Sequence, residues 1–257
     1  VAQNSGSAAS YYANLFQNMY TQGATEGWYR PMLGDWNGDM NDDLIVYHQS
    51  GEWSGIRSDG NGLPVAMEWI TSSYGGSIEY YYPYVGDFDG DGLTDALLYA
   101  TWGDYYVRLS DGDTFVWDDS DWMAGCACGA QDVPETNYQI MVGDIDGDTL
   151  DDLVLYEVET GSWYGAVSTG ADFNLSLWLT GLGSQDVGED WYHPVLGDVN
   201  GDGLADIGTA TSGGGWYLAL STGSSFSAQT TWYTSGHGSS TSQFFLQDMN
   251  ADGLADA

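Results

Sequence analysis

Aspartates recur along this 257-residue chain with one fixed spacing, and that spacing suits a hard metal cation. Five segments share the pattern Asp-x-Asp/Asn-x-Asp-x-x-x-Asp, and successive copies follow after 52, 57, 54 and 50 residues. Ca²⁺ takes about six to eight oxygen ligands from carboxylates, amides and backbone carbonyls. The pattern therefore predicts up to five calcium sites, one in each loop. The loops begin at Asp35, Asp87, Asp144, Asp198 and Asp248.

We number the first aspartate of each loop as position 1. Side-chain oxygens then stand at positions 1, 3, 5 and 9, and the backbone carbonyl at position 7 is a further expected ligand. The predicted ligands, loop by loop, are Asp35, Asn37, Asp39, Asn41 and Asp43; Asp87, Asp89, Asp91, Leu93 and Asp95; Asp144, Asp146, Asp148, Leu150 and Asp152; Asp198, Asn200, Asp202, Leu204 and Asp206; and Asp248, Asn250, Asp252, Leu254 and Asp256.

Magnesium, zinc and copper fit these loops less well than calcium does. Magnesium keeps more water ligands, and zinc or copper would need the His or Cys residues that these loops lack. A simple Asp-Gly turn is common, but five turns with the same carboxylate spacing favour calcium. A helical calcium-binding hand needs Glu at position 12. The four loops that reach position 12 have Val46, Leu98, Leu155 and Thr209 there.

The charge of the whole chain agrees with bound cations. Its 38 acidic residues face three basic ones, Arg30, Arg57 and Arg108, which gives a formal net charge of -35. This excess makes nucleic acid and anionic membrane surfaces poor partners, and it penalises a compact fold unless cations offset the repulsion. A solvated acidic surface, as in salt-adapted proteins, is the alternative to bound cations.

Neither a membrane span nor a secretion signal is visible in the sequence. No apolar run approaches the ~18 residues of a spanning helix, so we expect no membrane insertion. The first ten residues lack the basic and then apolar pattern of a signal peptide. If the protein is secreted, this is expected to be mature or partial sequence.

The segments around the loops repeat as well. An aromatic stretch precedes each loop, an apolar segment follows it, and a second apolar segment, a Ser-x-Gly turn and a last apolar segment complete the unit. Such short segments between Gly, Ser and Asp are typical of antiparallel strands. The second strand is marked by Trp53, Tyr105, Trp163 and Trp216; the turns begin at Ser58, Ser110, Ser168 and Ser221; the last strand carries Trp69, Trp117, Trp178 and Trp232.

Four strands in about 50 residues is the size of a propeller blade, which must stack on its neighbours to bury both faces. We therefore predict an all-β chain, a β-propeller of four-stranded antiparallel blades with Asp-rich calcium loops. The predicted blades span about residues 28–79, 80–136, 137–190 and 191–240, with a partial blade at 241–257. Residues 1–27 form an N-terminal segment that is a candidate closing strand for the last blade. That blade is otherwise incomplete or completed by another chain.

With these loops, the strand after them and the Trp/Ser-x-Gly segment, the chain from about Trp28 to Ala257 resembles the FG-GAP/VCBS repeat family. Integrin α-subunit propellers, some fungal lectins and many bacterial secreted proteins belong to this family. The resemblance implies a calcium-binding propeller, of seven blades in the family, in a secreted or cell-surface protein.

Three departures from the family pattern concern single loop positions. Met40 and Thr149 replace the usual Gly at position 6, and Asn41 replaces the apolar residue at position 7. Loops one and three are therefore expected to bind calcium more weakly. In the fifth loop, Ala251 replaces a Gly, which is a smaller change.

The first functional hypothesis is a non-catalytic recognition or adhesion module with a glycan or an extracellular protein as ligand. Its motive is the resemblance together with 12 Trp and 19 Tyr, which suit binding surfaces. Most of these aromatic residues recur at fixed repeat positions, so blade packing is the plainer role for them. Trp36, Trp102 and Trp122 fall outside the repeat, and residues 118–128 form an insertion in one blade that is the candidate ligand loop.

Two alternatives remain open. A structural subunit of an extracellular fibre or surface layer could self-associate into a filament by strand or blade completion between chains. A polysaccharide-active enzyme is the other alternative, since some lyases resemble this fold. His48, His193 and His237 are scattered, and the chain carries no Gly-x-Ser-x-Gly, His-Glu-x-x-His or phosphate-loop motif, so we expect no catalysis.

Cysteine and glycosylation patterns add little. Cys126 and Cys128 are one residue apart, and a disulfide between them would close a small strained ring, so free or structural thiols are expected. Asn174-Leu-Ser176 is a single glycosylation sequon that fits a secreted protein.

Overall fold

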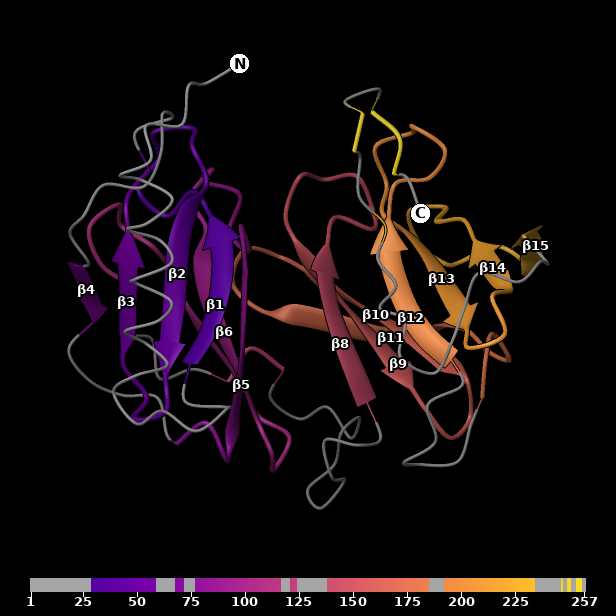
Figure 1. Cartoon of the computed structure of the whole chain (residues 1–257), viewed down its shortest axis with the longest axis horizontal. Helices are drawn as coiled ribbons and strands as arrows, with labels where there is room; N and C mark the ends of the chain where they lie inside the picture. Colours follow the sequence, from indigo (N-terminus) through magenta and orange to yellow (C-terminus); the bar gives the residue numbers. More distant parts are fainter. Residues whose placement is uncertain are drawn as a thin grey trace. The chain divides into compact units, whose positions relative to one another are not determined.

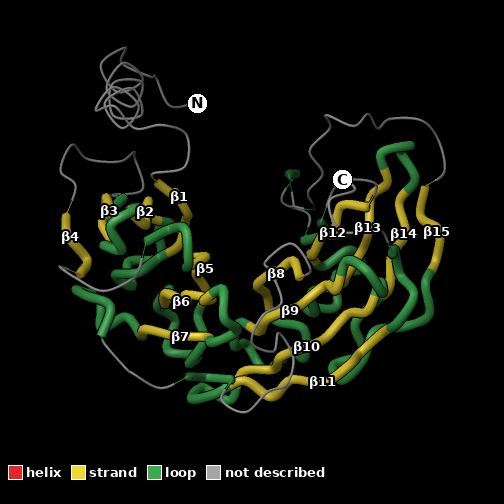
Figure 2. The backbone as a smooth tube through the Cα atoms, turned by 90° about the horizontal axis from the view of Figure 1, so that it is seen from below, coloured by secondary structure: helices red, strands yellow, loops and turns green. Residues whose placement is uncertain are grey.

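The computed structural model describes residues 29–58, 68–71, 77–116, 121–123, 138–184, 192–233, 246, 249–250 and 253–255. All regular structure in these segments is β-strand, and none is helix (Figure 2). The predicted all-β class is confirmed. In particular, the described segments include no apolar helix of membrane-spanning length.

The strands form four antiparallel sheets, each made of strands that are consecutive in the sequence (Figure 1). Three sheets have four strands, and the sheet β5–β7 has three in the described residues. The strands are β1 (Tyr29–Gly34), β2 (Asp43–His48), β3 (Trp53–Ile56) and β4 (Glu68–Thr71); β5 (Tyr81–Gly86), β6 (Asp95–Ala100) and β7 (Tyr105–Arg108); β8 (Tyr138–Gly143), β9 (Asp152–Glu157), β10 (Ser162–Ser168) and β11 (Phe173–Leu179); and β12 (Tyr192–Gly197), β13 (Asp206–Thr211), β14 (Trp216–Ala219) and β15 (Thr230–Tyr233).

Contacts divide the chain into two compact units. The first unit holds β1–β7, and the second holds β8–β15 together with residues 87–91 and 101–104. Each unit has its own core of aromatic and branched side chains. In the first, the core includes Trp36, Ile45, Tyr47, Trp53 and Phe115; in the second, it includes Ile145, Trp163, Trp178, Ile207 and Phe226.

Strand β2 shows why the segment after each loop is apolar without alternation. It is buried along its whole length. Because successive side chains point to opposite faces, Ile45 and Tyr47 enter the main core of the first unit, whereas Leu44 and Val46 pack in a second cluster with Ile56. The strand is thus covered on both faces, as expected for a blade between neighbours.

Directly opposed residues in the middle of the sheets are complementary in size, since a glycine faces a larger side chain. Ile45 pairs with Gly55 and Val154 pairs with Gly165, whereas in the fourth sheet the order is reversed and Gly208 pairs with Leu218. A Cβ at Gly165 would lie 2.5 Å from the Trp178 ring, which covers this glycine. Close packing leaves room for one large side chain in each of these pairs.

The predicted second and last strands are confirmed where they can be checked. Trp53, Tyr105, Trp163 and Trp216 begin equivalent pairings in their sheets. The described last strands carry Trp69, Trp178 and Trp232, as predicted. Each pairs across a bulge, and the extra residue of the bulge is Ile70, Trp178 or Trp232. Trp117, the cysteines and the N-terminal segment lie outside the described residues.

Candidate metal centre

The loops are tight because two of their backbone positions are left-handed. Position 4 is Gly38, Gly90, Gly147 or Gly201, each with φ between +78° and +87°. Position 6 has the same sign of φ, and here Met40 (φ 66°) and Thr149 (φ 76°) adopt it without being glycine. This conformation costs a non-glycine residue about 1–2 kcal/mol. The loops with Met40 and Thr149 therefore keep the common turn at an energetic cost.

This cost can be measured by exchanging residues between loops. We expect Thr149→Gly to raise the free energy of unfolding by about 1 kcal/mol, since relief of strain exceeds the entropy lost by glycine. The reverse change, Gly203→Thr, is a matched control, because a Cβ at Gly203 meets no atom within 4 Å and tests φ alone. Urea unfolding of both variants measures these changes in the free energy of unfolding. Equal stability of Thr149→Gly and the parent chain would contradict the proposed strain at position 6.

The position-1 aspartate of each loop is held by backbone amides of the same loop. Asp144 Oδ1 accepts from the amides of Asp146 (3.2 Å) and Gly147 (2.6 Å), and its Oδ2 accepts from Thr149 (3.0 Å). Asp198 accepts in the same way from Asn200, Gly201 and Gly203. These amides fix both oxygens toward the inside of the turn, where a carboxylate retains further lone pairs for a cation.

The position-9 aspartate begins the next strand and is fully buried. Asp43, Asp95, Asp152 and Asp206 are all 0% exposed. In the third loop, Asp152 Oδ1 accepts the amide of Ser168 at 2.7 Å and Oδ2 accepts that of Ile145 at 2.9 Å. The Ser amide makes the same bond in the other sheets, from Ser58, Ser110 and Ser221. This residue thus ties its loop to the Ser-x-Gly turn of its own repeat.

Burial and the neighbouring negative charges disfavour the ionised form of these carboxylates. Burial raises the pKa of Asp152 to about 7, with Asp146 and Asp148 adding to the effect, and it raises the pKa of Asp206 to about 6. The pKa of Asp89 and that of Asp146 are also raised, first by burial and then by neighbouring aspartates. A divalent cation would relieve both causes, since it offsets the repulsion and replaces the lost water.

Among the described residues, two loops gather three carboxylates into one small group. The carboxylates of Asp87, Asp89 and Asp91 each offer one oxygen within 4.8 Å of the others. Asp144, Asp146 and Asp152 form a second such group. An all-oxygen set of this kind, with no sulfur or imidazole, fits the ligand preference of calcium. The donor chemistry and the mutual repulsion of these residues therefore both suit a hard divalent cation.

The remaining predicted ligands are placed differently. In the first loop, Asn37 Nδ2 donates to Asp43 Oδ2 at 2.6 Å, so an amide of the loop takes part of the place expected for a cation. Asp148 is exposed and accepts the amide of Leu150. The position-7 carbonyls stay predicted ligands. Of the fifth loop, Asp248, Asp252 and Asp256 lie outside the described residues.

A set of contacts that the spacing did not reveal joins each loop to the next. The position-8 amide donates to the carbonyl of position 1 in the preceding loop, at 2.6–2.7 Å. The side chain of the neighbouring position-7 leucine packs on the position-4 glycine of that preceding loop; a Cβ at Gly147, for example, would lie 2.8 Å from Leu204. The amide bonds run from Thr94 to Asp35, Asp151 to Asp87, Ala205 to Asp144 and Ala255 to Asp198.

The Ser-x-Gly turn makes a second joint of this kind. The Ser hydroxyl donates to the position-2 carbonyl of the preceding loop, from Ser110 to Trp36 (2.7 Å) and from Ser168 to Phe88 (2.6 Å). Ser221 repeats the bond to Ile145 (2.5 Å). The loops therefore form a continuous series within each unit, and a cation held in one loop would stiffen the joint to the next.

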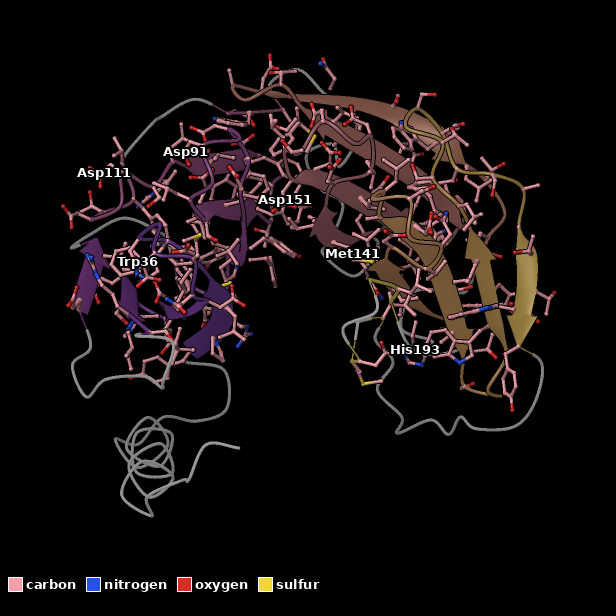
Figure 3. The ribbon with its side chains drawn as sticks, turned by 90° about the horizontal axis from the view of Figure 1, so that it is seen from above. Trp36, Asp91, Asp111, Met141, Asp151 and His193 are labelled. Carbon is pink, nitrogen blue, oxygen red and sulfur yellow. The ribbon has the colours of Figure 1, made fainter. Side chains whose placement is uncertain are left out.

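The position-2 residue is apolar because it lies under this joint, and the prediction that Trp36 falls outside the repeat is wrong. Trp36 occupies position 2 and is fully buried in the first unit (Figure 3). Trp122 is also buried, against Phe173 at 5.4 Å between ring centroids. Neither indole face is available to a ligand, whereas Trp102 is 40% exposed.

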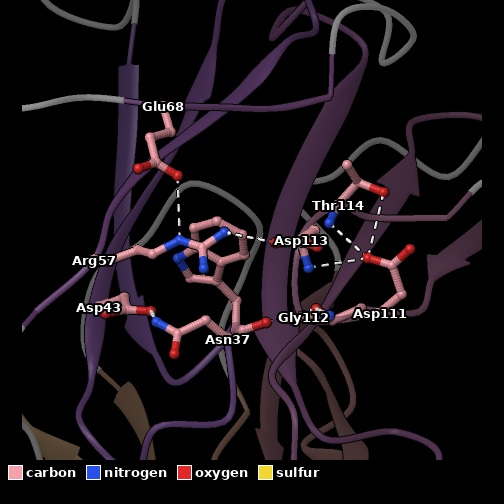
Figure 4. Close-up of polar contacts among 10 residues, drawn as sticks. Asn37, Asp43, Arg57, Glu68, Asp111, Gly112, Asp113 and Thr114 are labelled. Carbon is pink, nitrogen blue, oxygen red and sulfur yellow. Dashed lines mark hydrogen bonds and ion pairs between the residues drawn. The ribbon is translucent and has the colours of Figure 1, made fainter.

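Arg57 is one of three basic residues in this acidic chain, and it makes two ion pairs. Its guanidinium lies 4.5 Å above the Trp36 ring and pairs with Glu68 (3.1 Å) and Asp113 (3.2 Å) (Figure 4). Asp113 belongs to the turn that Asp111 closes by accepting the amides of Asp113 and Thr114. The guanidinium thus links the first sheet to the turn of the second, with both carboxylates exposed and the ion pairs correspondingly weak.

His48 is buried beside a serine hydroxyl. His48 Nε2 lies 2.6 Å from Ser54 Oγ, and both side chains are inside the β2–β3 sheet. Burial lowers the pKa of His48. This pair is closed off from substrates and packs the sheet, so it gives no support to hydrolytic chemistry.

Comparison with known proteins identifies the repeat. Residues 35–98 and 198–257 match the FG-GAP-like repeat family. No curated protein matches the chain. Among solved structures, an Agrocybe aegerita lectin described as recognising non-reducing terminal N-acetylglucosamine aligns with a TM-score of 0.71 and 19% identity, over 91% of this chain and 60% of the lectin. This chain therefore spans 60% of the length of that lectin.

At this identity the likeness shows the fold alone. Together with the four antiparallel sheets, it confirms the predicted β-propeller-type blades. A rhamnogalacturonan lyase, YesW, aligns with 18% identity over 76% of this chain and 42% of its own, but its TM-score of 0.38 is too low to support an argument.

Proposed function

Because this chain carries FG-GAP-like repeats, we propose that it is a calcium-stabilised, non-catalytic recognition module of an extracellular or cell-surface protein, with a glycan as its ligand. The observation that carries the proposal is the way the recurring aspartates are used. They hold their own loops closed and, through the loops, join one repeat to the next. Their role is therefore architectural, and the ligand is left to the exposed surfaces of the blades.

The calcium binding that we propose favours an extracellular location. For these loops, with three or four carboxylates each, we propose the affinity class of extracellular modules, about 10⁻⁴–10⁻³ M. Such sites fill where calcium is abundant. A net charge of -35 also suits a soluble surface that avoids nucleic acid.

A glycan is favoured over a protein ligand by one exposed aromatic site and by the lectin that shares the fold. Trp102 presents its indole in the turn between β6 and β7, and its Nε1 donates to Asp104 Oδ2 at 2.6 Å. An aromatic face held beside a carboxylate offers both contacts that a pyranose ring uses, stacking of its C–H face and hydrogen bonds from its hydroxyls. The insertion at residues 118–128 remains a candidate ligand loop, of which Asp121, Trp122 and Met123 are described.

A glycan array probed with the calcium-loaded protein tests this function. We expect binding that falls about five- to tenfold in Trp102→Ala, as for the loss of about 1 kcal/mol of aromatic contact. Tyr80→Ala is the matched control, since Tyr80 is an exposed aromatic residue outside this turn. Absence of glycan binding, combined with capture of a protein partner, would remove the lectin role and leave protein recognition.

A further inference from the structure

The second loop is held by the repeat that follows it. Residues 87–91 lie between β5 and β6 in the sequence, yet their contacts place them in the second compact unit, with β8–β15. The third repeat makes three contacts with this loop. They join Leu150 to Gly90, the Ser168 hydroxyl to the Phe88 carbonyl, and the Asp151 amide to the Asp87 carbonyl. The second and third loops therefore belong to one compact unit.

Asp151 makes a second bond that the equivalent residues of the other described joints lack. Its Oδ2 accepts the backbone amide of Asp87 at 2.8 Å, while its own amide donates to the Asp87 carbonyl at 2.7 Å. At the other described joints, Ala205 and Ala255 have no side-chain oxygen at this position, and Thr94 makes the amide bond alone. Asp151, labelled in Figure 3, thus binds both backbone polar groups of Asp87.

Both ends of this contact lead directly to a three-carboxylate group. Asp87 belongs to the group of the second loop, and its Oδ1 also accepts the Gly90 amide at 2.8 Å. Asp151 precedes Asp152, which belongs to the group of the third loop and accepts two buried amides. A movement of the Asp87 backbone must therefore pass to the third loop through Asp151, because short hydrogen bonds hold each step in place.

We propose that Asp151 couples calcium binding in the second and third loops, so that an ion bound in either loop raises the affinity of the other. This coupling rests on the calcium binding that we propose for these loops. An ion restricts the motion of the residues that bind it, and the two bonds between Asp151 and Asp87 extend this restriction to the neighbouring loop. The second ion then has fewer groups to order, which produces positive cooperativity. Asp151 is a positioning residue in this scheme.

Hydrogen exchange of the full chain, followed by mass spectrometry across a calcium titration, reads the two loops separately. The readout is the calcium concentration at which each loop is half protected. Asp89→Ala and Asp146→Ala each remove the position-3 carboxylate of one group. We expect Asp89→Ala to raise the midpoint of the third loop about fivefold or more, as is typical of coupled sites. Asp146→Ala should raise the midpoint of the second loop by the same factor, because coupling between two binding sites is reciprocal.

Variants at Asp151 identify what carries the coupling. Asp151→Ala removes the acceptor of the Asp87 amide, so in this background neither Asp89→Ala nor Asp146→Ala should move the midpoint of the other loop. Asp151→Asn keeps an acceptor oxygen and removes the charge, and it should retain the coupling. Asp42→Ala is the matched control, because Asp42 is exposed at the same position of the first loop, and it should leave both midpoints unchanged.

The outcomes distinguish the coupling from the proposed function. Calcium-dependent protection of both loops with independent midpoints overturns the coupling and leaves the calcium-stabilised module in place. Coupling that persists in Asp151→Ala, or that is lost in Asp151→Asn, overturns the role of the bonds to Asp87. If no loop gains protection with calcium, the proposed function and the coupling both fail. Protection of the buried strands β9 and β13 shows that a variant folds, and if Asp151→Ala does not fold, Asp151→Asn and the reciprocity of the two midpoints decide.

Discussion

Removing calcium should lower the stability of this protein strongly and reverse its dependence on pH. A ligand present at 100 times its Kd adds about 2.7 kcal/mol per site to the free energy of unfolding. In a chain of this size that corresponds to roughly 5–10 °C in Tm for each site. Chelation should therefore cost at least that amount, with added protease cleavage at the loops.

The reversal follows from the buried carboxylates. Without metal, the folded-state pKa is about 7 for Asp152 and about 6 for Asp206, above the ordinary value of 3.8. The folded state then binds more protons than the unfolded state between these values. The contribution of these groups is fully present below about pH 4 and is lost as the pH rises through 6 and 7. In chelator, Tm should rise as the pH falls from about 8 to about 5.

In the presence of calcium, the dependence of Tm on pH has the opposite sign. The metal needs ionised carboxylates, and protons compete with it for the same oxygens. Tm should therefore fall over the same pH interval. Melting curves at a series of pH values, in calcium and in chelator, with magnesium as control, give the two slopes. Parallel slopes, or equal Tm values with and without calcium, would contradict a structural role of the metal.

Replacing Asp152 with alanine should be the most damaging single substitution in the third loop. The change leaves the buried amides of Ile145 and Ser168 without an acceptor, at about 1–3 kcal/mol each. It also removes one carboxylate of the metal group. We expect a loss of about 3–5 kcal/mol, present both with calcium and in chelator.

Asp148→Ala separates the metal contribution from the packing contribution. Asp148 is exposed and accepts the amide of Leu150 at the surface of the same loop. Its loss should cost little in chelator and should weaken stabilisation by calcium. Urea unfolding of both variants in both conditions provides the comparison. If Asp148→Ala behaves as the parent chain in calcium, this residue is not a ligand; if Asp152→Ala costs less than about 1 kcal/mol, the buried amide bonds contribute less than we infer.

Much of the fold could be predicted because the sequence contains several copies of one structural unit, so that a pattern seen in one copy can be checked in the others. The predicted loop spacing, the apolar strand after it and the aromatic residue of the second strand all correspond to observed elements. A single copy could not separate a calcium loop from an Asp-Gly turn. The sequence pattern does not tell which residue of the outer strand enters the core: at the bulge, the first sheet has Ile70 where the third sheet has Trp178.

Contacts between repeats were beyond the reach of the sequence pattern. The position-8 amide is a backbone group, so Thr94, Asp151, Ala205 and Ala255 share a role without sharing a side chain. The apolar residue at position 2 varies from Trp36 to Val199, which concealed it as a repeat position. The pairing of Gly208 with Leu218, in which the glycine and the larger residue have exchanged strands, could not be predicted either, because it depends on the register of the two strands.

The most direct test of the metal centres is the number of calcium ions that the purified chain holds at equilibrium, measured by dialysis and elemental analysis at about 10 mM calcium, which exceeds the proposed Kd of about 10⁻⁴–10⁻³ M. We predict at least two bound ions, one in each three-carboxylate group, and up to five if every loop is filled. Asp148→Ala should lower the number by one. A chain that folds fully and retains no calcium would contradict the claim that these loops are metal centres.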